Sequence, residues 1–272
     1  MDTRKVVFIG AGNMSRSIIG GLVQSGYPAS AITATNPSQP KLDALQAQFG
    51  IRIGNDNRLA CQQADVIVLA VKPQLMASVC SDLATLDLSQ KLIITIAAGI
   101  PASRYQDFFA QPIQLVRTMP NTPSMLGLGL TGLYADAHVE QADRQFAGSL
   151  MAAVGEIVWF EHERGINQVI ACAGSSPAYF FLFMEAMEQA AAKLGVADAD
   201  ARLMIQQAAV GAAQMVKANP ELSLAQLRAQ VTSKGGTTFE AVNTLEQHNL
   251  RDSVDAAMQA AVNRAEQMAD QF

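Results

Sequence analysis

Over the first 160 positions, apolar residues occur either in short continuous runs or at helical spacing. Continuous runs stand at residues 6–9, 31–35, 65–71 and 92–96, and such runs are typical of strands that are buried on both faces of a sheet. Helical spacing follows the first two runs, at residues 17–25 and 41–49. Strands that alternate with helices predict a parallel α/β sheet.

The strand signal disappears after about residue 160. Long stretches rich in Ala, Met and Leu follow at residues 177–194, 198–216 and 250–268, with the apolar spacing of helices. Ser176 and Pro177 suit an N-cap and a first helical position, and Gly195 suits a helix end. The pattern predicts an α/β domain over residues 1–161 and an all-helical domain over residues 162–272. A helical domain this small and apolar is expected to complete its core with a partner subunit.

Composition narrows the functional classes. The net charge is −5 with no block of Lys or Arg, which argues against nucleic acid or an anionic membrane as a partner. No apolar run approaches the roughly 18 to 20 residues that span a bilayer, and no leader-like segment precedes the first strand. We therefore expect a soluble, unprocessed, cytoplasmic protein. The three cysteines and three histidines are scattered, which predicts neither a disulfide framework nor a metal site.

A glycine loop follows the first predicted strand. Such a loop between a strand and a helix is typical of a dinucleotide site. There the first glycine makes the turn, the second lets the backbone approach a pyrophosphate, and the helix N-terminus supplies N–H donors. Ser15 replaces the third glycine, and its hydroxyl is a candidate for a phosphate contact. An ordinary tight turn is the alternative interpretation. The loop residues are Gly10, Ala11, Gly12, Asn13 and Met14.

The end of the second predicted strand bears on the choice of cofactor. Enzymes that use NAD usually place Asp or Glu there, to bind the ribose 2′-hydroxyl. Residues 35–39 contain no acid, and Lys41 lies just beyond. We therefore expect NADP(H), with NAD(H) as the alternative because no arginine is present to bind a 2′-phosphate.

Four segments together resemble the pyrroline-5-carboxylate reductase family. They are residues 8–14, 70–74, 117–123 and 231–238, and the last two in this order are the more specific. The resemblance implies a Rossmann domain followed by a helical dimerisation domain, in a homodimer that can assemble into a ring of dimers. It also implies hydride transfer from NAD(P)H to the cyclic imine 1-pyrroline-5-carboxylate, which gives L-proline in the last step of proline biosynthesis.

The resemblance also implies roles for individual residues. Besides the glycine loop, it implies cofactor contacts from Asn36, Ser38, Asn57, Ala70, Val71, Lys72, Pro73, Ala97 and Ala98. It implies substrate contacts from Glu163, Ser233, Gly235, Gly236, Thr237 and Thr238, with the glycine–threonine segment built into the pocket of the dimer partner. The chain departs from the family's pattern at Ala173, Ser176 and Lys234, where the family has serine, glycine and proline.

The chemistry of imine reduction suits this set of residues. A protonated imine brings its own proton, so the cofactor carries the chemistry and the protein contributes position and electrostatics. We expect the N–H groups of Gly235, Gly236 and Thr237, together with Ser233, to bind the substrate carboxylate. The catalytic role goes to the Thr238 hydroxyl, which is expected to contact the ring nitrogen. Glu163 either favours the iminium charge or holds the loop.

Other interpretations stay open. Lys72 is equally an ordinary surface residue at a strand end, residues 235–236 are equally a loop before a helix, and residues 117–123 are equally a structural crossover with X-Pro constraints. Another reductase of the same architecture, for hydroxyacids or for a different imine, is the first rival. Hydroxyacid members of this broad class place a helix-borne lysine near the domain junction. After Ile166 the first lysine is Lys193, which argues against that activity. A regulatory or scaffold protein that binds the dinucleotide without turnover is the second rival.

Overall fold

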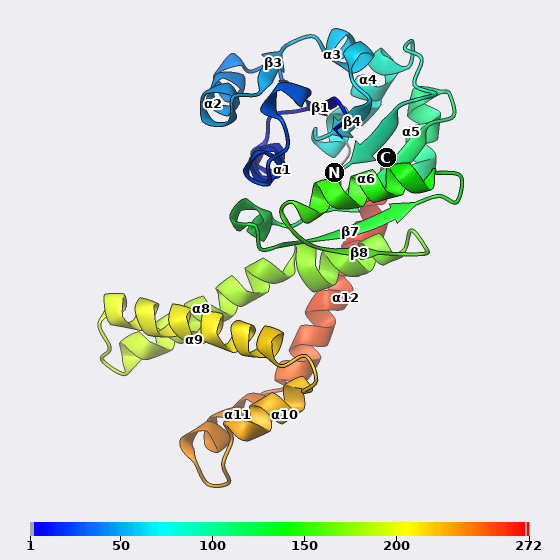
Figure 1. The fold of residues 1–272 in the computed structure, drawn as a ribbon. Helices are drawn as coiled ribbons and strands as arrows, with labels where there is room; N and C mark the ends of the chain where they lie inside the picture. Colours follow the sequence, from blue (N-terminus) through cyan, green and yellow to red (C-terminus); the bar gives the residue numbers. More distant parts are fainter. Residues whose placement is uncertain (1–2, 270, 272) are drawn as a thin grey trace. The chain divides into compact units, whose positions relative to one another are not determined.

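The computed structural model describes residues 3–269 and residue 271 (Figure 1). By contacts the chain divides into two compact units. The sheet unit runs to Ser175 and includes the end of the chain from Ala260, and the helical unit runs from Ser176 to Gln259. The predicted domain boundary at residue 161 stays a prediction. The last sheet strand ends at Trp159, and the residues from 162 to 175 belong by contacts to the sheet unit.

In the described part of the chain, one sheet of eight strands runs in the order β3-β2-β1-β4-β5-β6-β7-β8. Pairs from β3 to β6 are parallel, β7 is antiparallel to β6, and β8 is parallel to β7. The chain order reverses between β1 and β4, and open α/β sheets bind ligands beyond the carboxyl ends of the strands at such a point. The strands are β1 (Val6–Ile9), β2 (Ile32–Thr35), β3 (Arg52–Gly54), β4 (Val66–Leu69), β5 (Leu92–Thr95), β6 (Gln114–Met119), β7 (Gly129–Ala135) and β8 (Gly155–Trp159).

The central strands are continuously apolar because both faces of the sheet are covered. In β1, Val6 and Phe8 belong to one core cluster, while Val7 and Ile9 belong to the other. Helices α1 (Asn13–Gln24), α2 (Gln39–Phe49) and α6 (Gln141–Ala152) contribute to the first cluster. Helices α3 (Asn57–Gln63), α4 (Pro73–Leu83) and α5 (Ala102–Phe109) contribute to the second. The predicted parallel α/β fold with a helical C-terminal region is confirmed.

The predicted helix start at Ser176 and Pro177 is confirmed to within one residue, because α8 (Ser176–Lys193) begins at Ser176. Helix α7 (Gly165–Val169) and a π-helical segment (Ile170–Gly174), which the sequence did not predict, come directly before α8 and extend this helical stretch back to Gly165. Pro177 has no N–H to donate to the carbonyl of Ala173, four residues earlier. That carbonyl instead accepts a hydrogen bond from Nδ2 of Asn121 at 3.0 Å. A distant side chain therefore binds a carbonyl that the proline nitrogen cannot.

This continuous stretch bears on the membrane expectation. By length and composition alone, residues Gly165–Lys193 could cross a membrane. The expectation that no part of the chain approaches such a span is therefore too strong, although core helices of soluble proteins meet the same criterion. The predicted helix end at Gly195 is confirmed, because this glycine has a φ of +80° after the last turn of α8.

The helices of the helical unit carry little buried surface. Among described residues, α8 and α11 (Thr237–Gln247) contain no buried side chain, and α9 (Asp198–Ala218) contains only Ala201 and Ile205. The exposed large apolar residues include Phe180, Phe181, Leu182, Leu203 and Met204. The remaining elements are α10 (Leu224–Gln230), α12 (Leu250–Ala269) and the 3₁₀ turns η1 (Ala29–Ala31) and η2 (Thr122–Leu126).

Candidate cofactor site and active site

The glycine loop lies at the point where the strand order reverses. Gly10 has a φ of +110°, and a Cβ atom there would lie 2.4 Å from the carbonyl oxygen of Ala70, so no other residue fits without a shift of the backbone. The Gly10 N–H donates to the Thr35 carbonyl at 2.8 Å, and the Ala70 N–H donates to the Ile9 carbonyl at 2.9 Å. The loop is therefore anchored to the ends of β1, β2 and β4.

The N-terminus of α1 is open to a ligand. Gly12 stands at the N-cap with a φ of −83°, and no side chain caps the helix. A Cβ atom at Gly12 would meet no atom within 4 Å, so this glycine faces free space. The first turn of α1 contains no acid. Uncapped N–H groups beside free space fit the pyrophosphate of a dinucleotide.

The suggested phosphate contact of Ser15 is not supported. Ser15 is 1% exposed, and its hydroxyl donates to the Gly10 carbonyl at 2.7 Å. This hydrogen bond stabilises the glycine loop from inside and turns the hydroxyl away from solvent. The serine at the third glycine position therefore stabilises the loop.

The predicted ribose contacts lie at the end of β2. Oδ1 of Asn36 is 3.4 Å from the N–H of Ala11, and Nδ2 is 3.5 Å from the carbonyl of Ser38. Asn36 thus links the second loop to the glycine loop. Ser38 stands at the N-cap of α2 without a side-chain capping bond, and the first turn of α2 contains no acid. The absence of a carboxylate in that turn suits a ligand that carries a 2′-phosphate.

The remaining predicted cofactor residues also follow strand ends. Asn57 begins α3, and its Oδ1 accepts a hydrogen bond from the buried Thr35 hydroxyl at 2.6 Å. Ala70 and Val71 follow β4, and the exposed Lys72 stands at the N-cap of α4. Pro73 is the first residue of α4, which no side chain caps. Both interpretations of Lys72 stay open, since a strand end next to the loop is also the place for a cofactor contact.

Ala97 and Ala98 lie in the turn from β5 to α5. The Ala97 N–H is 3.3 Å from the hydroxyl of Thr95, which is 2.6 Å from the hydroxyl of Tyr105. Tyr105 is completely buried, and burial raises its pKa above the usual range. Sequence reasoning missed Thr95 and Tyr105. The apolar spacing of Ala102, Tyr105 and Phe109 was a usable signal, because it points the tyrosine into the core, where its hydroxyl needs a partner.

Glu163 lies in the sheet unit, and its Oε1 is already engaged. It accepts a hydrogen bond from the N–H of Ala102 at 2.6 Å and forms an ion pair with Arg117. The Arg117 side chain is 6% exposed and that of Glu163 is 33% exposed. The carboxylate therefore neutralises a buried cation and binds the first N–H of α5. Arg117 itself lies on β6, so the crossover interpretation of residues 117–123 holds only beyond Met119.

The glycine–threonine segment belongs to the helical unit. Gly235 has a φ of +74°, and the N–H of Gly236 donates to the carbonyl of Ser233 at 3.0 Å. Gly236 is the N-cap of α11, Thr237 and Thr238 are its first residues, and no side chain caps it. The structure thus brings these five residues together at one helix N-terminus, which suits a carboxylate. Both threonines are exposed, as is Lys234 at the position that differs from the family.

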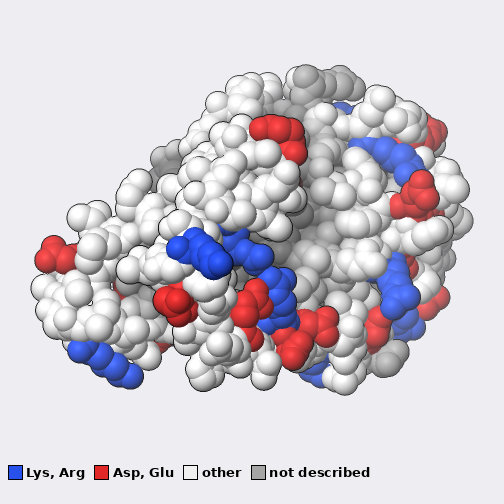
Figure 2. All heavy atoms as spheres, turned by 90° about the horizontal axis from the view of Figure 1, so that it is seen from below, with Lys and Arg blue, Asp and Glu red and all other residues white. Residues whose placement is uncertain are grey.

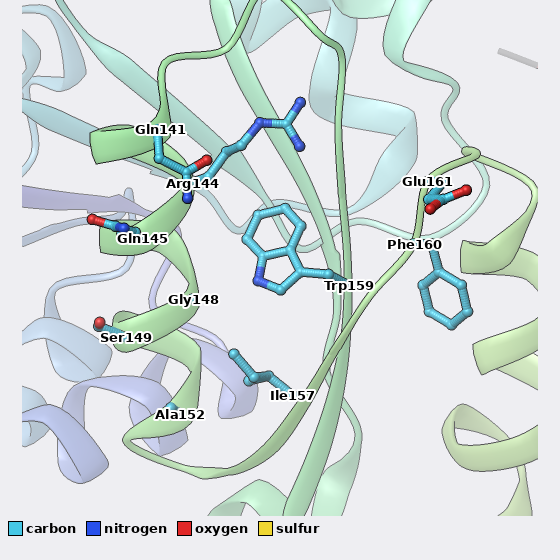
Figure 3. Close-up of a pocket in the computed structure, with 10 residues that line it drawn as sticks. All are labelled: Gln141, Arg144, Gln145, Gly148, Ser149, Ala152, Ile157, Trp159, Phe160 and Glu161. Carbon is cyan, nitrogen blue, oxygen red and sulfur yellow. The ribbon is translucent and has the colours of Figure 1, made fainter.

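A pocket elsewhere contains none of these residues. It has a volume of about 780 Å³ and lies between α6 and β8, where Figure 3 shows Trp159 between Arg144 and Ile157. Its lining includes Gln145 and Ser149 of α6. We do not place the chemistry there, because β8 is the strand at the far end of the sheet from the reversal between β1 and β4. Among residues 3–269 and 271, no cluster of His, Cys, Asp or Glu is suited to a metal ion.

The strand order, the glycine loop and the uncapped helix N-termini define a dinucleotide-dependent oxidoreductase of the Rossmann class. The family model for NADP oxidoreductases, coenzyme F420-dependent, matches residues 5–99, and the model for pyrroline-5-carboxylate reductase dimerisation matches residues 163–268. The pyrroline-5-carboxylate reductase of Vibrio alginolyticus is 57% identical over the whole of both chains. The chain belongs to the pyrroline-5-carboxylate reductase family.

Solved structures agree with this assignment. A pyrroline-5-carboxylate reductase from Coxiella burnetii is 41% identical and superposes with a TM-score of 0.93 over 98% of this chain and 99% of that chain. The Plasmodium falciparum pyrroline carboxylate reductase with NADP bound is 25% identical, with a TM-score of 0.88 over 99% of both chains. The chain is thus an NAD(P)-dependent oxidoreductase with a helical region of the family's dimerisation type.

Proposed function

We propose that the chain reduces the C=N bond of 1-pyrroline-5-carboxylate to L-proline, with hydride from NADPH, as the last step of proline biosynthesis. The observation that carries this proposal is the similarity over the full length of both chains to the reductase of Vibrio alginolyticus. It extends over both the glycine loop and the glycine–threonine segment. NADH is the alternative hydride donor, and the absence of an acid in the first turn of α2 favours NADPH.

The sheet unit is proposed to bind the cofactor, which supplies the hydride when bound. The N–H groups at the start of α1 bind the pyrophosphate, because they are uncapped and face free space. Asn36 and Ser38 bind the adenosine ribose and its phosphate. The turn after β5 borders the nicotinamide. The full set proposed for the cofactor is Gly10, Ala11, Gly12, Asn13, Met14, Asn36, Ser38, Asn57, Ala70, Val71, Lys72, Pro73, Ala97 and Ala98.

The helical unit is proposed to bind the substrate. The N–H groups of Gly235, Gly236 and Thr237, with Ser233, bind its carboxylate at the positive end of α11. The Thr238 hydroxyl contacts the ring nitrogen and orients the iminium, so that no strong acid is required. Glu163 is proposed on the substrate side of the nicotinamide turn. Two roles were predicted for Glu163, to favour the iminium charge or to hold the loop. Its contacts to Ala102 and Arg117 favour the second role.

We further infer that the working form is a homodimer, which can assemble into a ring of dimers, in the cytoplasm. The dimerisation model over residues 163–268 and the exposed apolar helices support self-association. A complete site would then combine the glycine–threonine segment with the pocket of the partner subunit. We propose neither a membrane nor a nucleic-acid partner. On the face shown in Figure 2, Lys and Arg lie among Asp and Glu, which offers no extended basic surface.

The test is to follow the absorbance of the reduced nicotinamide with the purified protein. We expect oxidation of NADPH only when pyrroline-5-carboxylate is present, at a higher specificity constant than with NADH. Oxidation with a 2-keto acid in place of the imine would favour the hydroxyacid reductase. Cofactor binding without turnover on any of these substrates would favour a regulatory or scaffold protein.

A further inference from the structure

The turn from β5 to α5 is held at its first end by buried hydroxyl groups. The N–H of Ala97 is 3.3 Å from Oγ1 of Thr95, and that oxygen is 2.6 Å from the hydroxyl of Tyr105. Both hydroxyl-bearing residues are 0% exposed. Tyr105 comes from α5, the element that follows the turn, so this hydrogen bond joins the last residue of the strand to the helix. The position of Ala97 therefore depends on two side chains that no solvent reaches.

The other end of the turn is held by an ion pair. Oε1 of Glu163 accepts a hydrogen bond from the N–H of Ala102, the first residue of α5, at 2.6 Å, and pairs with Arg117. The two ends are connected through the sheet, because Thr95 and Arg117 are partners in the register of β5 and β6. The hydroxyl of Thr118 also donates to the Thr95 carbonyl at 3.0 Å. The turn is thus fixed to the sheet by a connected polar network.

This network stands in an otherwise apolar region. Ile93, Ile100 and Phe109 of the same core cluster are completely or almost completely buried. Apolar side chains of similar volume often stabilise a core as well as a buried ion pair does. A fully satisfied buried polar network instead specifies one arrangement of the backbone around it.

We propose that Thr95, Tyr105 and the Arg117–Glu163 pair are positioning residues, which hold Ala97 and Ala98 against the nicotinamide and so set the geometry of hydride transfer. The inference rests on the proposed function, since the turn is assigned to the nicotinamide there. Reactions between bound groups depend steeply on geometry, and a misplacement of about 1 Å can cost about 100-fold in rate. None of the four side chains needs to touch the substrate for this effect.

The experiment compares hydroxyl deletions at two buried tyrosines. Tyr105→Phe removes the bond to Thr95, whereas Tyr27→Phe removes bonds to the backbone of Arg4, before the start of β1. Thr95→Val removes the hydroxyl from both of its partners, and Thr95→Ser keeps it. For each variant, the single-turnover rate of NADPH oxidation by pyrroline-5-carboxylate, the dissociation constant of NADPH and the thermal midpoint are measured.

We expect Thr95→Val to slow hydride transfer by about 10-fold and Tyr105→Phe by about 3-fold, within the range for loss of one or two hydrogen bonds. NADPH affinity should stay within about 2-fold, Thr95→Ser should restore the rate, and Tyr27→Phe should lower only the thermal midpoint. Equal rates in all four variants, or losses that follow NADPH affinity alone, would overturn the inference. A wild-type protein that does not reduce the imine would instead overturn the proposed function.

Discussion

The two units of this chain differ in how far they bury their own apolar side chains. In the sheet unit every residue of β1 is buried and α1 buries six residues, whereas α8 buries none although it carries consecutive phenylalanines. The sheet unit therefore completes its own core. The helical unit leaves apolar side chains uncovered, which is costly in water. The difference supports self-association through the helical unit, in agreement with the family's dimerisation model over residues 163–268.

One ion pair from each unit shows a similar contrast in burial, although the sheet unit also contains the exposed pair Arg104–Asp107. In the sheet unit, Arg117 is buried against Glu163. In the helical unit, Glu246 pairs with Arg251 at 2.6 Å and with Arg228 at 3.7 Å, and all three side chains are more than a third exposed. The hydrogen bond from Arg251 lowers the pKa of Glu246. Because this pKa is lower in the folded state, the pair contributes to the stability of the fold at pH values above the carboxyl's unfolded pKa, and this contribution is lost as the pH falls through the folded pKa. The contribution is small, since exposed ion pairs stabilise a fold little.

The largest effects are expected when the chain is cut near the boundary between the two units. A chain that ends at Ser175 lacks the glycine–threonine segment and also the residues of α12 from Ala260 that belong to the sheet unit. It should lose turnover completely, while it keeps all the residues proposed for the cofactor and still binds NADPH. A chain that ends at residue 161 should also lose turnover, and it should be less stable, since Arg117 then lies buried without Glu163. The free energy of unfolding should differ between these two truncated chains by on the order of 1.5–3 kcal/mol, the size of a hydrogen bond to a charged group. Denaturant unfolding and NADPH titration measure both quantities, and turnover by either truncated chain would refute the division.

Association should depend on the apolar surface of α8. Phe180 and Phe181 are 65% and 64% exposed, so their replacement by serine removes little packing within the chain. If they lie in the interface, dissociation should become easier by about 2 kcal/mol or more, which is roughly 30-fold. Sedimentation over a range of concentrations measures this. Gln206→Ser on α9 is the matched control, and an unchanged association constant of the phenylalanine variant would exclude this face of α8.

Within the sheet unit, two glycines of the glycine loop should respond differently to replacement by alanine. Gly10→Ala places a Cβ atom at a φ of +110° and 2.4 Å from the Ala70 carbonyl, so it should destabilise the fold by roughly 1–3 kcal/mol. Gly12→Ala points into free space and should leave the thermal midpoint unchanged while it weakens NADPH binding. A Gly12→Ala variant with wild-type NADPH affinity would show that the pyrophosphate does not bind at this loop.

The smallest expected effect concerns Thr238 in the helical unit. Thr238→Ala should slow turnover by roughly 2- to 13-fold, the consequence of losing one neutral hydrogen bond, and should leave NADPH affinity unchanged. Thr238→Ser keeps the hydroxyl and should remain near wild type. As the pH rises and the imine loses its proton, the alanine variant should lose activity earlier than wild type. A loss of thousands-fold would show proton delivery instead of orientation, because general acid catalysis contributes about 10²–10⁴-fold.

Much of the sheet unit could be predicted because the continuous apolar runs of its sequence are also the strands that the fold buries. The runs at 6–9 and 92–96 became β1 and β5, and the glycine loop stands where the pattern placed it. The strands β3 and β8 gave no comparable signal, since their residues are only partly buried. The end of the helical stretch at Gly195 was predicted correctly from a glycine that needs a positive φ.

Contacts between distant residues explain what could not be predicted. The helical segments before α8 were not predicted, and the Ala173 carbonyl in them accepts a hydrogen bond from Nδ2 of Asn121, more than fifty positions earlier. No local rule connects these two residues. In the same way, the partners of Tyr105 and Glu163 come from other elements of the sheet unit. The resemblance supplied the proposed site residues, while the contacts that hold them came only from the fold.

The central claim is that hydride passes from NADPH to the imine carbon of pyrroline-5-carboxylate. It is tested most directly with NADPH that is deuterated at the transferred position and mass spectrometry of the product. The account predicts L-proline with one deuterium at C5 for each NADPH consumed. Unlabelled proline, or NADPH oxidation without proline, would contradict it.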